Sequence, residues 1–222
     1  MTDRPEVVVF DVLETLIDLD PLGARLEEVG QPAALLEPWF MRFQRDAMAL
    51  TLAGDDAPFE PVARETLRTE TRHRLSEADI DYVLAGFARL PTFDDAAPAL
   101  RTLCQARIAV GCLTVGSPDN TRRFLDGAGL SEFVDEVITT QGAGVWKPHP
   151  GIYHFAANYM HTPIERMALV AVHAWDCHGA KRAGALAGWC ARLEQKPGDV
   201  FLPADVTGES LVEVADKLLT LH

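Results

Sequence analysis

The sequence is short of positive charge. Lys and Arg together number 20 against 33 Asp and Glu, so the 222-residue chain carries a formal net charge of -13. Such a surface repels phosphate backbones and anionic lipids, which argues against nucleic-acid binding and membrane-surface binding. An anionic small molecule can still bind, but only where a local cation offsets the field of the protein.

Cysteine is also scarce, and the four cysteines, Cys104, Cys112, Cys177 and Cys190, show no CxxC spacing. The chain is neither short nor rich in cysteine, so we expect reduced, mostly buried thiols. A metal site built from Cys and His ligands is disfavoured because the ligand spacing is missing.

Long apolar runs are absent, and none approaches the length of a membrane-spanning helix. The N-terminus carries Asp3 and Glu6 ahead of only a short apolar run, which is unlike a signal peptide. We therefore predict a soluble, cytoplasmic protein.

The sequence does contain short apolar runs that alternate with helical patterns. The runs, which are typical of buried parallel strands, are Glu6–Phe10, Ile108–Leu113, Val134–Ile138, Met167–Val172 and, more weakly, Ala187–Leu193. The helical patterns are Ala96–Ala106, Asn120–Gly127, Gly151–Met160, Cys177–Ala185 and a closing Glu209–Leu221. This alternation predicts an α/β fold with a doubly wound, Rossmann-like parallel sheet.

One stretch, from about Asp20 to Leu90, has no strand-like run. Its segments with helical spacing are Pro21–Val29, Leu35–Leu52, Pro61–Arg74 and Glu77–Arg89. We predict a catalytic core made of residues 1–18 and 91–222, with residues 19–90 forming a helical cap after the first strand. A cap of this kind would close over the carboxyl ends of the strands, where such folds place their sites.

Four polar residues stand out: Asp11, Thr114 and Asp176 follow predicted strands, and Lys147 lies in a loop with two prolines before a predicted helix. Each has an ordinary structural explanation. Asp11 and Asp176 could cap a turn or a helix, and Lys147 could lie on the surface. Thr114 could cap a helix, although Ser117 before Pro118 suits that role better. No single one of the four is specific, but together they follow one order along the chain.

The order of these residues along the chain resembles the haloacid dehalogenase superfamily, and within it the type II L-2-haloacid dehalogenases. The resemblance covers nearly the whole chain, including Trp39 and Phe59 in the predicted cap. The matching motifs are Phe10-Asp11-x-x-x-Thr15-Leu16, Leu113-Thr114-x-Gly116-Ser117-Pro118, Lys147-Pro148 with Tyr153, and Ala174-Trp175-Asp176-x-x-Gly179-Ala180.

The resemblance implies a hydrolase in which Asp11 attacks the carbon that bears the halogen and forms an aspartyl ester, which water then hydrolyses. Lys147 would keep Asp11 ionised and Asp176 would position Lys147, with Thr15 and Thr114 in the same site. Residues expected to contact the substrate are Leu13, Phe40, Val115, Tyr153, Trp175 and Phe59. Neither metal nor cofactor is implied, the substrate would be a small molecule such as a short organic acid, and a homodimer is compatible with the sequence.

Most members of the superfamily are magnesium phosphatases, which is the first alternative. They carry two further Asp residues, at the positions of Leu13 and Val172 here, so both the general acid and most of the metal site are missing. Without metal, a phosphate about 4 Å from Asp11 would be repelled by about 4 kcal/mol at an effective dielectric near 20.

The second alternative is a catalytically weak member with a binding role, because several positions depart from the dehalogenase pattern. Phe40 stands where these enzymes have a halide-binding Arg, and Val115 where they have Asn. Loss of a charge-assisted hydrogen bond to a developing anion commonly costs ~2–4 kcal/mol. Arg42 and Arg45 are close in sequence but do not share the helical face of Phe40.

Further departures are Glu14, Ala171 and His173, in place of Gly, Ser and Asn. His173 has two interpretations: a general base that activates the hydrolytic water, or a neutral imidazole bonded to backbone or to Asp176. His149 and His178 are expected at the surface or as helix caps.

Overall fold

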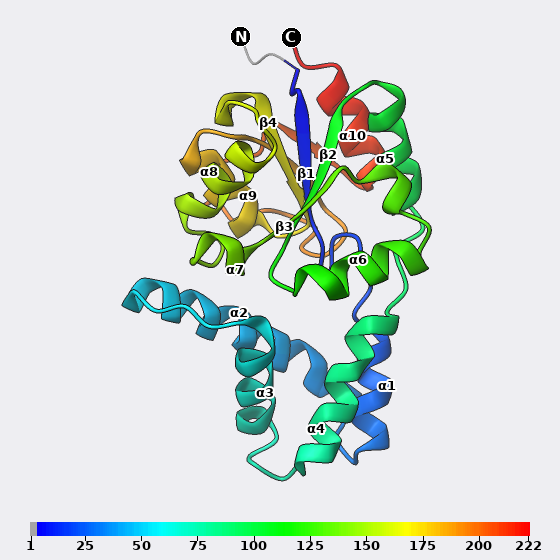
Figure 1. Cartoon of the computed structure of the whole chain (residues 1–222), viewed down its shortest axis with the longest axis vertical. Helices are drawn as coiled ribbons and strands as arrows, with labels where there is room; N and C mark the ends of the chain where they lie inside the picture. The colour runs from blue at the N-terminus through cyan, green and yellow to red at the C-terminus, as the bar shows by residue number, and fades with distance from the viewer. Residues whose placement is uncertain (1–3) are drawn as a thin grey trace.

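The computed structural model describes residues 4–222 and contains one six-stranded sheet (Figure 1). Residues 1–3, which include Asp3 and the start of the predicted core segment, lie outside the described residues. The strand order is β3-β2-β1-β4-β5-β6, and every neighbouring pair is parallel. The strands are β1 (Val7–Asp11), β2 (Ala109–Thr114), β3 (Glu136–Thr139), β4 (Met167–Ala171), β5 (Leu186–Cys190) and β6 (Val206–Gly208). The predicted doubly wound parallel sheet is therefore confirmed.

The central strand β1 pairs with β2 on one side and β4 on the other, and all five of its residues are buried. Val7 and Val9 pack into one hydrophobic cluster, whereas Val8 and Phe10 pack into the other, on the opposite face of the sheet. Burial of both faces explains why this strand is a continuous apolar run. The carboxyl ends of β1, β2 and β4 consequently lie side by side.

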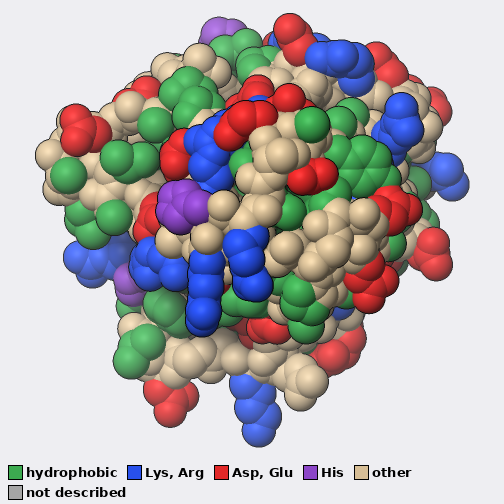
Figure 2. Space-filling view, turned by 90° about the horizontal axis from the view of Figure 1, so that it is seen from below, with side chains coloured by type: hydrophobic (Ala, Val, Ile, Leu, Met, Phe, Trp, Pro, Cys, Tyr) green, Lys and Arg blue, Asp and Glu red, His purple; other side chains and the backbone are tan. Residues whose placement is uncertain are grey.

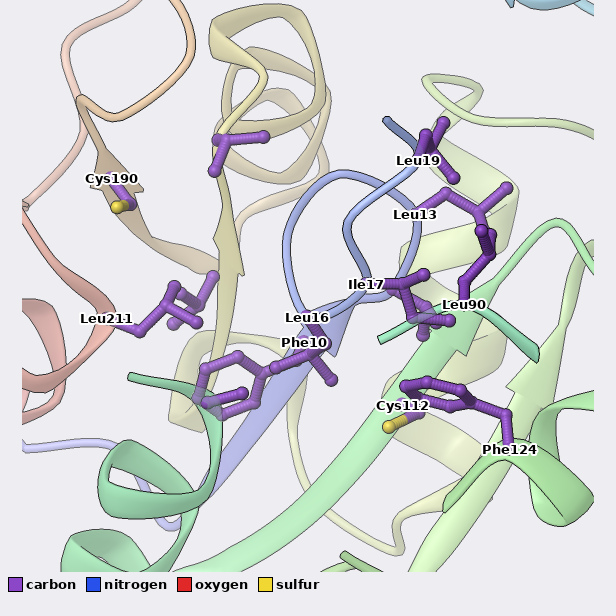
Figure 3. Packing of buried hydrophobic residues seen from close by; sticks show 14 of the residues in the cluster. Phe10, Leu13, Leu16, Ile17, Leu19, Leu90, Cys112, Phe124, Cys190 and Leu211 are labelled. Carbon is purple, nitrogen blue, oxygen red and sulfur yellow. The ribbon is translucent and has the colours of Figure 1, made fainter. Parts of the chain in front are cut away.

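Helices cover both faces of the sheet (Figure 1). One face is covered by α5 (Ala96–Gln105) and α10 (Leu211–Leu219), and the other by α8 (Pro150–Tyr159) and α9 (Ala174–Ala183). Figure 3 shows Phe10 of β1 and Leu211 of α10 in the first of these clusters. Further elements complete the core: α6 (Pro118–Gly127), α7 (Thr140–Ala143) and the 3-10 turns Ser131–Phe133 and Ile164–Arg166.

The segment between β1 and α5 forms a group of helices beyond the carboxyl ends of the strands (Figure 1). This helical insert comprises α1 (Pro21–Glu28), α2 (Leu36–Ala53), α3 (Phe59–Glu70), α4 (Glu77–Leu84) and the 3-10 turns Ala33–Leu35 and Ala85–Arg89. Seen from its own side of the molecule, the surface carries side chains of both charge signs (Figure 2). The four predicted helical segments are confirmed, whereas their division from the core as a separate domain stays a prediction.

Two linkers join the insert to the core and run side by side. The Asp18 N–H donates to Pro91 O at 3.0 Å, and the Phe93 N–H donates to Leu16 O at 3.0 Å. Leu19 and Leu90, one from each linker region, belong to the same hydrophobic cluster (Figure 3). Farther along the insert, the hydroxyl of Thr51 accepts a hydrogen bond from the backbone N–H of Trp146 at 2.9 Å. The insert is thus fixed against the core both at its linkers and through α2.

The sequence-based predictions differ from the structure in a few places. Strand β6 was not predicted because it has three residues, one of them exposed, and too short an apolar run. Helix α9 begins at Ala174 rather than Cys177, so Asp176 lies inside its first turn and is not its N-cap. Ser117 caps α6, as predicted, and accepts a hydrogen bond from the Asn120 N–H.

The four cysteines are free thiols, three of them buried and Cys104 partly so, which confirms the prediction for these residues. Within residues 4–222, no helix is both long enough and apolar enough to cross a membrane.

The fold depends on close contact at Gly188 of β5. A Cβ at this position would lie 2.6 Å from Cγ1 of Val214 in α10, well inside van der Waals contact. We expect Gly188→Ala to lower the free energy of unfolding by about 1–3 kcal/mol. Gly127→Ala is the matched control, because a Cβ there meets nothing within 4 Å. Urea unfolding of both variants checks this, and equal midpoints would contradict the packing described.

Candidate active site

A buried lysine joins two carboxylates at the carboxyl edge of the sheet. Lys147 Nζ donates to Asp11 Oδ1 at 2.8 Å and to Asp176 Oδ2 at 2.7 Å. Asp11 is the last residue of β1, Lys147 lies in the loop before α8, and Asp176 is in the first turn of α9. All three residues are less than a tenth exposed. The parallel topology brings these three segments to one place, as their positions in the sequence predict.

The charges of this group depend on one another. Burial alone would raise the pKa of Asp11, but Lys147 and His173 more than offset it and hold that pKa well below 3.8. Burial opposes the charge of Lys147, yet Asp11 and Asp176 raise its pKa above 10.5. Burial also raises the pKa of Asp176, and Lys147 acts against this rise. At neutral pH, Asp11 is therefore an ionised carboxylate beside an ammonium group.

Two hydroxyl groups fix the carboxylates. Thr15 Oγ1 donates to Asp11 Oδ2 at 2.8 Å and accepts from the Val172 N–H at 3.2 Å. Tyr153 OH donates to Asp176 Oδ1 at 2.5 Å. Burial and the adjacent Asp176 raise the pKa of Tyr153 well above 10, so its hydroxyl remains a donor.

His173, the residue before α9, makes contacts that the sequence did not predict. Its Nε2 lies 2.7 Å from Glu14 Oε2, and its Nδ1 lies 3.4 Å from Asp11 Oδ2. Burial opposes protonation, but hydrogen bonds to Asp11 and Glu14 raise the pKa of His173 to about 10. The predicted bond from a neutral imidazole to Asp176 is not found, since the ring contacts Asp11 and Glu14 and its raised pKa favours the protonated form. The alternative role as a general base stays a prediction.

A small cavity of about 30 Å³ lies above Asp11, with room for about one or two water molecules. The core contributes Asp11, Leu13, Val115, Trp146, Lys147, His173 and Trp175 to its lining. Helix α2 contributes Phe40, Phe43, Gln44, Ala47 and Met48. The walls are therefore mainly apolar and aromatic, with the charged groups gathered at the end of β1.

Of the residues predicted to contact the substrate, Leu13, Phe40, Val115 and Trp175 line this cavity, and two others do not. Tyr153 is fully buried behind Asp176, so it can act on the site only through that residue. Phe59 begins α3 and packs edge-on against Phe43, with ring centroids 4.9 Å apart, so Phe43 stands between it and the cavity. Neither residue lines this cavity, and their contact with the substrate stays a prediction.

Thr114 stands at the carboxyl end of β2, as predicted, but its hydroxyl serves the backbone. Its Oγ1 accepts a hydrogen bond from the Gly116 N–H at 3.0 Å. Arg42 and Arg45 of α2 do not substitute for the missing cation, since they pair with Glu70 and Asp46.

Of the α2 residues that line the cavity, only Phe40 was predicted from the sequence. Phe43, Gln44, Ala47 and Met48 follow it at the i+3, i+4, i+7 and i+8 positions, which form one helical face. That periodicity was a usable signal. Glu14 was noted only as a departure from a motif, because nothing local indicates that it meets His173.

Metal ligands are not grouped at this site. Among residues 4–222, no cluster of three or more His, Cys, Asp or Glu side chains could hold a metal ion. Leu13 and Val172, at the positions that would complete a magnesium site, are buried and apolar.

The chain is similar to known proteins over most of its length. A family model described as haloacid dehalogenase-like hydrolase matches residues 5–184. An (S)-2-haloacid dehalogenase of Pseudomonas putida is 27% identical over 213 residues, covering 87% of this chain and 90% of the relative. (S)-2-haloacid dehalogenase 4A of Burkholderia cepacia is 27% identical, covering 96% and 95%.

The fold is also similar to that of a solved structure. The structure of L-2-haloacid dehalogenase from Xanthobacter autotrophicus superposes with a TM-score of 0.90 over 98% of this chain and 100% of that one. The sequence identity is 22%, so this likeness concerns the fold alone.

The pairing of Lys147 with Asp11 and Asp176 leads to a prediction about the stability of the protein. Lys147→Met leaves two buried carboxylates without their cation, which should destabilise the protein by about 3–5 kcal/mol at pH 7. In the parent protein, the lowered pKa of Asp11 contributes stability above pH 3.8 that is lost as the pH falls. In the variant, burial favours protonated carboxylates. The difference in free energy of unfolding between variant and parent protein should therefore become smaller as the pH falls toward 4.

Urea unfolding at pH 7 and near pH 4 measures both quantities. Lys217→Met is the control, because its pair with Glu213 is about half exposed and should contribute under about 1 kcal/mol. If Lys147→Met lowered the free energy of unfolding by the same amount at both pH values, this would contradict the ion pair of Lys147 with Asp11.

Proposed function

The chain belongs to the haloacid dehalogenase-like hydrolase family, and we propose that it hydrolyses the carbon–halogen bond of short 2-halo acids through an ester of Asp11. The observation that carries this proposal is the ionised Asp11 beside Lys147, at the base of a cavity with apolar walls. The 2-haloacid dehalogenases to which the chain is similar support the choice of substrate.

In the first step, an Asp11 oxygen attacks the carbon that bears the halogen. A carbon–oxygen bond forms, the carbon–halogen bond breaks, and the halide leaves with the electron pair. Lys147 keeps the nucleophile charged, and Thr15 holds its orientation. Attack from the side opposite to the halide inverts the configuration at that carbon.

In the second step, water adds to Cγ of Asp11 and the bond from Cγ to the alkyl oxygen breaks. The departing oxygen takes up a proton to give the 2-hydroxy acid, and the Asp11 carboxylate is restored. Cleavage at Cγ leaves the inverted carbon untouched. The cavity above Asp11 is large enough for the water.

The leaving-group side of the cavity is built from aromatic and aliphatic side chains, with Phe40 at the position where the dehalogenase pattern has a cation. Gln44 lies one helical turn beyond Phe40 on the same face and brings an amide group to the lining. Halides are weak bases and depart without protonation, so an apolar wall suits them better than it suits a departing alkoxide. Magnesium-dependent phosphatase chemistry has less support, because Leu13 and Val172 offer no oxygen ligand.

We expect chloride or bromide release from (S)-2-halopropionates in the presence of a chelator, with the (R)-2-hydroxy acid as product. Asp11→Asn should lower the rate by about a thousandfold or more, because it removes the nucleophile. Asp216→Asn, at an exposed position on α10, is the matched control and should be fully active. Ion chromatography and chiral analysis measure the two products.

Turnover of phosphomonoesters that requires magnesium, with no halide release at any pH tested, would reject this proposal in favour of a phosphatase.

A further inference from the structure

We infer that His173 and Glu14 form a second charged pair on Asp11, in which the His173 imidazolium acts on the ester-hydrolysis step and Glu14 positions it. This inference rests on the proposed function. It assigns a catalytic role to His173, which contacts the reacting carboxylate, and a positioning role to Glu14, which acts through His173.

The geometry places one cation on each oxygen of Asp11. Lys147 Nζ lies 2.8 Å from Oδ1, and His173 Nδ1 lies 3.4 Å from Oδ2. Glu14 Oε2 occupies the other side of the imidazole, 2.7 Å from Nε2. His173 lines the cavity and is 5% exposed, so it faces the reacting groups with little contact with solvent.

The charged groups around His173 favour its protonated form. Asp11 and Glu14, from β1 and the loop after it, lie within reach of its two nitrogens. Lys147 lines the same cavity and opposes this effect, while α2 contributes the uncharged amide of Gln44. The carboxylate of Glu194 accepts a hydrogen bond from the backbone N–H of the next residue, Ala174, at 2.9 Å.

Glu14 occupies a conformation that most side chains avoid. Its φ of 65° is in the left-handed region, where glycine is the usual residue. The Glu14 N–H donates to Ile17 O at 2.9 Å, so the tight loop after β1 holds this conformation. In this conformation its carboxylate lies 2.7 Å from the buried His173, which is the placement that a positioning role requires.

The pair fits the second step of the reaction. Whichever oxygen of Asp11 forms the ester, one cation faces the carbonyl oxygen and the other faces the ester oxygen. Addition of water to Cγ places negative charge on the carbonyl oxygen, and the cation that faces this oxygen stabilises the charge. When the bond to the ester oxygen breaks, the electron pair goes to that oxygen, and a proton converts it to the alcohol. The water supplies the hydroxyl group and, in the end, that proton, so Asp11 is regenerated and one proton is released per turnover.

Formation of the ester also changes His173. The negative charge of Asp11 disappears, and Glu14 alone remains to offset the burial that lowers the pKa of His173. The imidazolium proton is then held less tightly at the step in which the substrate oxygen must gain one. The pair therefore links the protonation of His173 to the state of the nucleophile.

A titration tests the pair without requiring activity. The His173 ring resonances, assigned by comparison with His173→Asn, should titrate near pH 10 in the parent protein. Glu14→Gln keeps the side-chain shape but removes the charge, so the titration should move to clearly lower pH. Glu37→Gln, at an exposed position on α2, should leave it unchanged. An imidazole that titrates near 6.5 in the parent protein would overturn the pair.

Single-turnover kinetics test its role. With a 2-halo acid, His173→Asn should release one equivalent of halide in a burst, accumulate the Asp11 adduct in intact-protein mass spectra, and lower kcat by about 10- to 100-fold together with KM. In Glu14→Gln, the loss of activity at high pH should begin at a lower pH than in the parent protein. His154→Asn, at an exposed site on α8, is the control and should match the parent protein.

A slower kcat in His173→Asn without a burst or an adduct would overturn the assignment to ester hydrolysis. Absence of halide release from the parent protein would overturn the proposed function and this role with it, whereas the titration would still decide whether the pair exists.

Discussion

The buried ammonium group of Lys147 is the interaction on which the rest of the site depends. Removing such a charge from water costs several kcal/mol, and it is stable here because carboxylates of Asp11 and Asp176 lie within 2.8 Å. The Asp11 carboxylate in turn remains ionised because the cation lies beside it, while Lys147 opposes the rise that burial causes in the pKa of Asp176. Three separate segments of the chain supply these groups, and the parallel sheet brings them to one edge. The fold and the charge network therefore stabilise each other.

This arrangement also sets the character of the cavity. Relative to the dehalogenase pattern, a cation is absent at Phe40 and another is present at His173, where Glu14 neutralises it. On the proposed mechanism, a cation on the leaving-group side is thus replaced by an ion pair of His173 and Glu14 on the nucleophile side. In that mechanism, departure of the halide would receive little electrostatic assistance, whereas cleavage of the ester would receive more. A site of this kind favours good leaving groups and depends on fast hydrolysis of the covalent intermediate.

Much of this could be predicted from sequence, because buried parallel strands leave continuous apolar runs and polar residues at their ends converge at one edge. Asp11 and Asp176 were found this way, whereas Lys147 was indicated by the order of the four residues, which resembles the dehalogenases. How far a side chain lies from the cavity could not be predicted from sequence. Whether Tyr153 or Phe59 lines the cavity or lies one layer behind it depends on packing between helices. The protonation of His173 was also out of reach, since it depends on Glu14 in a left-handed conformation. The face of α2 that carries Gln44 could have been read from helical periodicity.

The central claim is that Asp11 forms an ester that water cleaves at Cγ, and oxygen labelling tests it most directly. With the enzyme in excess over a 2-halo acid, the reaction is run once in ¹⁸O-water, and both the product and the peptide containing Asp11 are analysed by mass spectrometry. The account predicts ¹⁸O in the Asp11 carboxylate and unlabelled oxygen in the 2-hydroxy acid. Label in the product, with none in Asp11, would mean that water attacks the substrate directly and would contradict the account.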